Sequence, residues 1–131
     1  MNPIETREAE QFFSDFVTAF ATFDGRVVAE RYLEPFVAID GEGAQRLLKT
    51  RAEIGNYFQG FLNDYRAKGS TSCRYDELEI VAMGSTSALL TVSWELMNDH
   101  KAVVQTWRES YVVVRLSAGL FVTTSIDHRE V

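Results

Sequence analysis

The sequence has a single cysteine, Cys73, among its 131 residues. One cysteine excludes an intrachain disulfide and any zinc site built from several cysteines. A lone cysteine suits a reducing compartment, and the N-terminal segment MNPIETREAEQ has no apolar signal-peptide core. We therefore expect a cytoplasmic protein.

Long hydrophobic runs and basic clusters are also missing. The uninterrupted apolar runs are only a few residues long, far short of the ~20 residues that a membrane-spanning helix needs. Lysine and arginine total 13 against 19 acidic residues, a net charge of −6, and they form no run. A nucleic-acid-binding surface needs a basic patch that neutralises phosphates. The sequence therefore predicts neither membrane insertion nor nucleic-acid binding.

The chain is long and apolar enough for one folded domain. Hydrophobic residues make up 46% of it, which excludes a disordered protein. Its length fits one domain over residues 1–131, and no internal repeat or linker divides it. Nine phenylalanines, five tyrosines and two tryptophans make sixteen aromatic side chains, enough to build a core or the wall of a pocket.

Three segments in the first half have a helical spacing of apolar residues. The segment EAEQFFSDFVTAFATFD places its large apolar residues on one face. A short helix, RVVAERYL, follows a capping Asp24 and is ended by Pro35. The third helix opens at Thr50 and Glu53, which have the spacing of a capping box, and ends near Gly69.

The remaining segments alternate like strands. A hairpin is expected over 36–40 and 44–49, and four long strands are expected over 74–83, 87–97, 102–116 and 120–127. Helices that precede a run of antiparallel strands indicate an α+β fold. Because three helices can cover only part of a curved sheet, we expect a cavity on its inner face.

The element order and two stretches resemble a known superfamily. In DGRVVAERYLEPFVAIDGEG, a short helix with Tyr32 is followed eight positions later by Asp40, and LFVTTSIDH resembles a last strand that ends at a pocket. These features resemble the nuclear-transport-factor-2-like (NTF2-like) superfamily, in its SnoaL-like and ketosteroid-isomerase-like branch. The resemblance implies a cone-shaped fold, with a bent antiparallel sheet wrapped around three N-terminal helices and an apolar pocket.

The resemblance also allows a test of steroid isomerase chemistry. In that branch the acid that matches Asp40 removes a proton next to a carbonyl, while a tyrosine and a neutral carboxylic acid stabilise the enolate. The tyrosine position matches Phe16 here, and the late-strand acid matches Val112. Loss of one such donor commonly lowers the rate by a factor of about 100 to 1000. The resemblance therefore argues against steroid isomerase activity.

Two candidate catalytic residues have an ordinary structural alternative. Asp40 is either a pocket-facing acid, with a pKa raised by Phe36 and Ile39, or a turn residue that bonds its own backbone. His128 is either a general base at the pocket mouth or a solvated residue near the terminus.

Arg108 is the third candidate, and it depends on which face of its strand points inward. If Val112 faces the pocket, so do Arg108 and Ser110, four and two residues away. Arg108 is then available to hold a carboxylate or an enolate, or to pair with Asp40; otherwise it is an outward arginine near the rim. The opposite face would expose Trp107 and Tyr111, and we expect a homodimer to form there.

The other pocket residues follow from the apolar stripes, and no cofactor is expected. The histidines His100 and His128 lack the spacing of a metal site, and GSTSALL lacks the glycine spacing of a phosphate loop. We therefore predict no metal and no cofactor. The predicted lining residues are Phe16, Tyr32, Tyr57, Phe58, Phe61, Trp94, Ser110 and Val112.

Two functions fit this pattern. In the first, the pocket binds a small, largely apolar organic molecule and carries out cofactor-free acid–base chemistry of the isomerase, dehydratase, cyclase or hydrolase type. In the second, the chain is a non-catalytic dimeric module that binds a ligand or a protein, with phenylalanines filling the pocket. Fold alone does not choose between them, because one architecture can carry unrelated functions.

Overall fold

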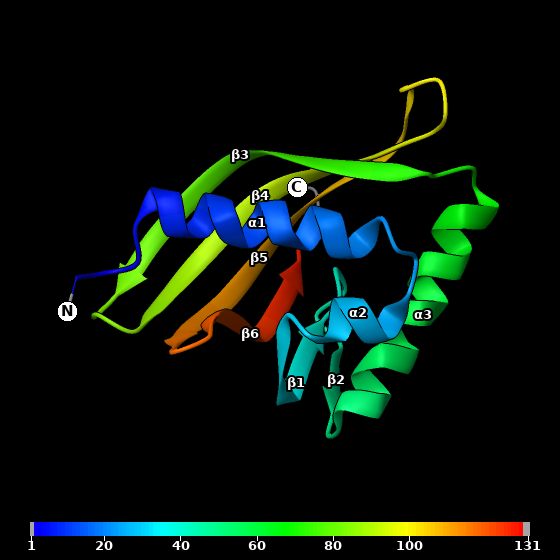
Figure 1. Ribbon diagram of the computed structural model, residues 1–131. Helices are drawn as coiled ribbons and strands as arrows, with labels where there is room; N and C mark the ends of the chain where they lie inside the picture. The colour runs from blue at the N-terminus through cyan, green and yellow to red at the C-terminus, as the bar shows by residue number, and fades with distance from the viewer. Residues whose placement is uncertain (1, 130–131) are drawn as a thin grey trace.

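The computed structural model describes residues 2–129. In Figure 1, α1 crosses one face of a bent sheet, while α2 and α3 lie together at one end of it. The elements, in chain order, are α1 (Thr6–Phe20), α2 (Gly25–Ala29), β1 (Tyr32–Ile39), β2 (Gln45–Leu48), α3 (Arg51–Ala67), β3 (Ser72–Met83), β4 (Ser87–Met97), β5 (Val103–Leu116) and β6 (Gly119–Asp127).

The six strands form one sheet in the order β2-β1-β6-β5-β4-β3. The meander β3 to β6 and the hairpin β1–β2 are antiparallel, as the sequence predicts. However, β1 pairs with β6 in parallel, so the sheet is mixed and not purely antiparallel. This pairing joins the early hairpin to the last strand of the meander. The architecture is the cone-shaped α+β fold that the resemblance implies.

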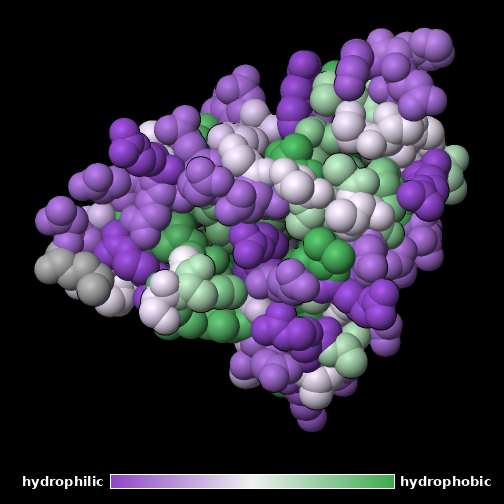
Figure 2. Space-filling view, in the orientation of Figure 1, coloured by the Kyte–Doolittle hydropathy of each residue, from purple (hydrophilic) through white to green (hydrophobic). Residues whose placement is uncertain are grey.

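The aromatic stripe of α1 forms the centre of the core. Phe12, Phe13, Phe16 and Phe20 are each at most 7% exposed. The Phe13 ring lies 5.6 Å from Tyr111 and 5.9 Å from Trp94 of the sheet. Each such burial contributes about 1.5–3 kcal/mol. The face that carries α1 is covered mainly by polar residues, with smaller apolar groups between them (Figure 2).

The second helix is shorter than predicted. It begins after Asp24, whose Oδ1 accepts the Arg26 N–H at 2.9 Å, so the predicted cap is confirmed. It ends at Ala29, and Tyr32 opens β1 opposite Val122 of β6. The prediction that this helix extends to Pro35 was therefore wrong, because pairing with a distant strand overrides the local helical pattern.

The third helix begins as predicted. The Thr50 Oγ1 accepts the Glu53 N–H, and a Glu53 carboxylate oxygen accepts the Thr50 N–H, both at 3.2 Å. Gly69, with φ of 94°, adopts the left-handed conformation expected after the helix end. None of the helices within residues 2–129 is both long and apolar enough to span a membrane.

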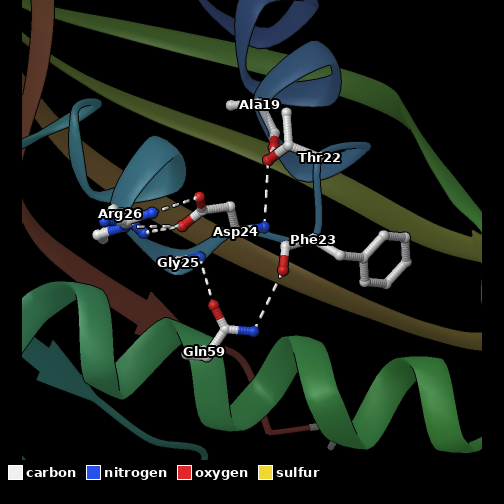
Figure 3. Close-up of polar contacts among 7 residues, drawn as sticks. All are labelled: Ala19, Thr22, Phe23, Asp24, Gly25, Arg26 and Gln59. Carbon is white, nitrogen blue, oxygen red and sulfur yellow. Dashed lines mark hydrogen bonds and ion pairs between the residues drawn. The ribbon is translucent and has the colours of Figure 1, made fainter.

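A glycine contact joins α2 to α3. A Cβ on Gly25 would lie 2.2 Å from the backbone oxygen of Gly55, so only glycine allows this approach. The Gln59 side chain bridges the same junction: its Oε1 accepts the Gly25 N–H at 2.7 Å, and its Nε2 donates to the Phe23 carbonyl at 3.1 Å (Figure 3). The junction holds α3 over the inner face of the sheet.

We predict that Gly25→Ala lowers the free energy of unfolding by about 3 kcal/mol, because the added methyl group overpacks a backbone contact. The matched control is Gly60→Ala in the same α2–α3 unit. Gly60 is exposed and a Cβ there meets nothing within 4 Å, so this change should add about 0.5–1 kcal/mol. Urea unfolding measures both; equal midpoints for Gly25→Ala and the wild type would contradict the prediction.

Candidate functional site

A pocket of about 310 Å³ lies between the inner face of the sheet and the helices α1 and α3. This volume is at the lower end of the range for small-molecule sites, roughly 300–1000 Å³. Its wall is mainly aromatic. Six residues that the sequence singled out line it, namely Phe16, Tyr32, Tyr57, Phe58, Phe61 and Trp94.

The inner face of β5 is the opposite of the predicted one. Trp107, Glu109 and Tyr111 line the pocket, whereas Arg108 and its neighbours two and four residues along do not. Tyr111 is 1% exposed and packs on Phe13 of α1. Since side chains alternate along a strand, an error of one residue reverses the whole assignment. Tyr111 is therefore part of the core and is not available to an outer interface.

The same reversal corrects two lining residues and one match to the isomerase branch. Ser110 and Val112 belong to the outer face and are absent from the pocket wall. An outward Val112 does not correspond to a pocket-facing acid. The acid on this strand that faces the pocket is Glu109. The match of Val112 to the late-strand acid therefore no longer counts against steroid isomerase activity, while Phe16 still stands at the tyrosine position.

The structure places Asp40 in a turn. Its Oδ1 accepts the backbone N–H groups of Glu42 and Ala44 at 2.9 and 3.0 Å, and the residue is exposed outside the pocket wall. Aspartate commonly stabilises turns in this way. The turn alternative therefore describes Asp40, and the structure does not bring it to the pocket.

Arg108 lies on the outer face, where its guanidinium is already bonded. It pairs with the Glu79 carboxylate at 2.8 Å and donates to the Ser93 Oγ at 3.0 Å. These contacts, together with the reversed face, remove Arg108 from the pocket.

His128 is exposed and its ring also lies on the outer side. Its Nε2 is 2.7 Å from the Ser110 Oγ, which is itself 2.7 Å from the Thr91 Oγ1. This chain of hydrogen bonds joins β4, β5 and the end of β6. Asp40, Arg108 and His128 therefore all lie outside the pocket wall.

Two acids that the sequence did not single out are paired in the pocket. Glu109 of β5 and Asp127 of β6 are directly opposite each other in the antiparallel register, and both line the pocket. Glu109 Oε1 accepts a hydrogen bond from Trp107 Nε1 at 2.9 Å. Glu109 is half-buried. Because it lines the pocket, the part of its surface that stays accessible belongs to the pocket wall.

Burial, together with the adjacent charge of Asp127, raises the pKa of the Glu109 carboxyl to about 8, although hydrogen bonds from Trp107 and Tyr111 lower it. Burial also raises the pKa of Asp127. Because two close carboxylates resist double ionisation, the pair holds one proton near neutral pH, mainly on Glu109. It then presents one acid and one base to the same pocket.

Neighbouring groups extend the hydrogen-bonded system. Trp94 Nε1 donates to Tyr111 Oη at 2.7 Å, and the Tyr111 hydroxyl bonds in turn to Glu109. Burial raises the pKa of Tyr57 to about 12 and also raises the pKa of Tyr65, so both hydroxyls stay neutral. The Cys73 thiol also lines the pocket, with its pKa raised by burial to about 12, and is therefore a poor nucleophile.

A metal site finds no support in the part of the chain that the structure describes, since within residues 2–129 no three acidic, cysteine or histidine side chains come close enough to hold an ion.

The signal for the carboxyl pair was present in the sequence. Glu109 alternates with Trp107 and Tyr111 in TWRESY, and an acid between two inward aromatics marks a polar group in an apolar wall.

We predict that the stability of the fold falls as the pH rises from about 4.5 to 8. The folded-state pKa of Glu109 lies above its ordinary 4.5, so the folded chain holds its proton more tightly than the unfolded chain does. The contribution of Glu109 is complete below pH 4.5 and is lost as the pH passes 8. The expected loss is on the order of a few kcal/mol.

Urea unfolding at pH 5 and pH 9 measures this loss. The variant Glu109→Gln should flatten the profile, whereas the exposed control Glu10→Gln should keep it. Parallel profiles for the wild type and Glu109→Gln would contradict the prediction. The carboxyl carbon resonance of Glu109 provides a direct second measurement of its pKa.

Solved structures share this fold. An NTF2-like protein with a cystatin-like fold from Novosphingobium aromaticivorans matches with a TM-score of 0.72 and 13% identity, over 93% of this chain and 79% of that one. A protein of unknown function with a cystatin-like fold from Nostoc punctiforme has a TM-score of 0.77 and 11% identity, over 99% and 96% of the two chains.

A third match is a ketosteroid isomerase-like protein from Erwinia carotovora atroseptica, with a TM-score of 0.66 and 15% identity over 95% of this chain and 97% of that one. At these identities the matches show the fold alone. No curated protein matches the chain. A family model described as "NTF2-like protein (DUF6841)" matches residues 7–130, nearly the whole sequence. The superfamily resemblance is thereby confirmed: the chain belongs to the NTF2-like family that this model describes.

Proposed function

We propose that the chain binds a small, largely apolar organic molecule in this pocket, and that Glu109 and Asp127 exchange protons with it without a cofactor. The observation that carries the proposal is the pair of carboxyl groups in an aromatic wall. A buried acid with a raised pKa destabilises the folded state at neutral pH. Such groups cluster at functional sites, where an acid and a base are needed at the same pH.

The pair offers a simple division of roles. Asp127, which is ionised, accepts a proton from a C–H next to a carbonyl or from a hydroxyl of the ligand. Glu109, which is protonated, donates a hydrogen bond or a proton to the oxygen where negative charge develops. Apolar walls strengthen both interactions because they exclude water. Isomerisation and dehydration both use this sequence of proton transfers.

The aromatic wall supports a compact ligand. Phe58, Phe61 and Trp94 present apolar surface, while Tyr57 and Tyr65 add neutral hydroxyl groups. Apolar contacts of this kind supply affinity, and a few polar groups set orientation. The similarity in fold to a ketosteroid isomerase-like protein is consistent with proton-transfer chemistry, but the proposal depends on Glu109 and Asp127 of this chain.

A thermal-shift screen with apolar ketones, lactones and epoxides tests binding. For a ketone that stabilises the protein, exchange of its α-hydrogens with deuterium, followed by NMR, tests proton transfer. We expect Glu109→Gln and Asp127→Asn each to slow the exchange by a factor of about 100 or more. Asp40→Asn should keep the wild-type rate, because Asp40 acts in a turn. Unchanged rates in both pocket variants would refute the acid–base roles.

The alternative function is a non-catalytic dimeric module, and the outer sheet face favours a dimer. Val81 and Met83 of β3 are 56% and 43% exposed there, and alternation places Val112 near the centre of the same face. Apolar side chains on the open face of a sheet are typical of a self-association surface. We propose that a homodimer forms through this face, without Trp107 and Tyr111, which the sequence prediction assigned to it and which line the pocket instead.

Light scattering at micromolar concentration should give the mass of two chains for the wild type. Val112→Glu should give the mass of one chain, because it places a charge in the centre of the apolar interface. The control Ser117→Glu, in the exposed β5–β6 turn, should remain dimeric. A wild-type mass of one chain would contradict the proposed dimer.

A further inference from the structure

The charges that face the pocket do not balance. Glu109, Asp127 and Asp64 line it, and Lys68 is the one basic side chain among the described lining residues. The Lys68 ammonium lies 3.5 Å from the Gln105 Oε1, so it is directed to an amide neighbour. With one proton shared by Glu109 and Asp127, the inner end of the pocket keeps one negative charge.

The rings around this charge form a continuous wall. The Trp107 ring centroid lies 5.8 Å from that of Tyr65 and 6.5 Å from that of Trp94, and the Tyr65 ring lies 6.1 Å from that of Phe61. Tryptophan and tyrosine faces attract cations through their ring quadrupoles, most strongly where water is excluded. Trp107 also donates to Glu109, which places the rings beside the carboxyl pair.

Tyr32 adds a neutral polar group to the wall. It lines the pocket, and burial raises the pKa of its hydroxyl, so the hydroxyl stays protonated. This hydroxyl is a polar group of the pocket wall in addition to the carboxyl pair.

We infer that the ligand of this pocket is an organic monocation, an amine or quaternary ammonium with an apolar body, that lies against the wall formed by the Trp107 and Tyr65 rings and pairs with the carboxylate of Asp127. The inference rests on the proposed binding function and specifies its ligand class. A monocation balances the remaining charge, while its apolar body contacts the phenylalanine-rich wall. An anionic ligand would face a like charge in an apolar site.

Three compounds of similar size test the charge preference at pH 7: benzylammonium, benzyl alcohol and benzoate. NMR titration of the Trp107 indole N–H measures each affinity for the wild-type protein. We expect benzylammonium to bind at least 10-fold more tightly than benzyl alcohol, and benzoate to bind more weakly than the alcohol. In Asp127→Asn the preference for benzylammonium over the alcohol should fall at least 5-fold. The control Asp99→Asn, in an exposed turn, should keep it.

The outcomes separate the two proposals. If benzyl alcohol or benzoate binds as tightly as benzylammonium, the ligand-class inference is overturned while the pocket proposal stands. If none of the three shifts the Trp107 resonance and the ketone, lactone and epoxide screen is also negative, both proposals fail. The wild-type series decides the matter even if Asp127→Asn does not fold.

Discussion

The packing of the α1 phenylalanines against Trp94 and Tyr111 determines which face of the sheet is the inner face. Phe13 and Phe16 contact both of these aromatic rings, and all four side chains are nearly inaccessible to solvent. Side chains alternate along β5, so fixing Tyr111 inward also fixes Trp107 and Glu109 inward. The packing of these aromatic rings thereby decides which polar side chains of β5 face the pocket.

The inward position of Glu109 opposes stability. Its pKa is raised because burial disfavours the charged form, and Asp127 adds repulsion. A leucine or glutamine there would avoid this unfavourable interaction near neutral pH. The fold tolerates it because the surrounding core is large and aromatic, and because Trp107 and Tyr111 donate hydrogen bonds to the carboxyl group. A conflict of this kind between stability and local chemistry is characteristic of functional sites.

The remaining wall of the pocket depends on a backbone contact. Gly25 and Gly55 allow α2 and α3 to approach, and the Gln59 side chain bonds to the backbone of Phe23 and Gly25 at the start of α2. Tyr57, Phe58 and Phe61 of α3 line the pocket from this position. The outer face of the sheet has a different character, with the hydrogen-bonded chain of Thr91, Ser110 and His128 and the Arg108–Glu79 ion pair. Arg108 and His128, two of the three catalytic candidates predicted from the sequence, thus make their contacts on the outer face.

The sequence by itself determined α1, α3, the start of α2, most strand boundaries and the aromatic stripes, because period and capping are local properties: the Phe12–Phe20 stripe and the Thr50–Glu53 box are both present. It also placed Phe16, Tyr57 and Phe58 on apolar faces. Only the tertiary structure decided that β1 runs parallel to β6, that Tyr32 opens a strand, and that Glu109 and not Arg108 faces inward. Alternation along a strand defines two sides without naming the inner one, and contact with α1 supplies that information.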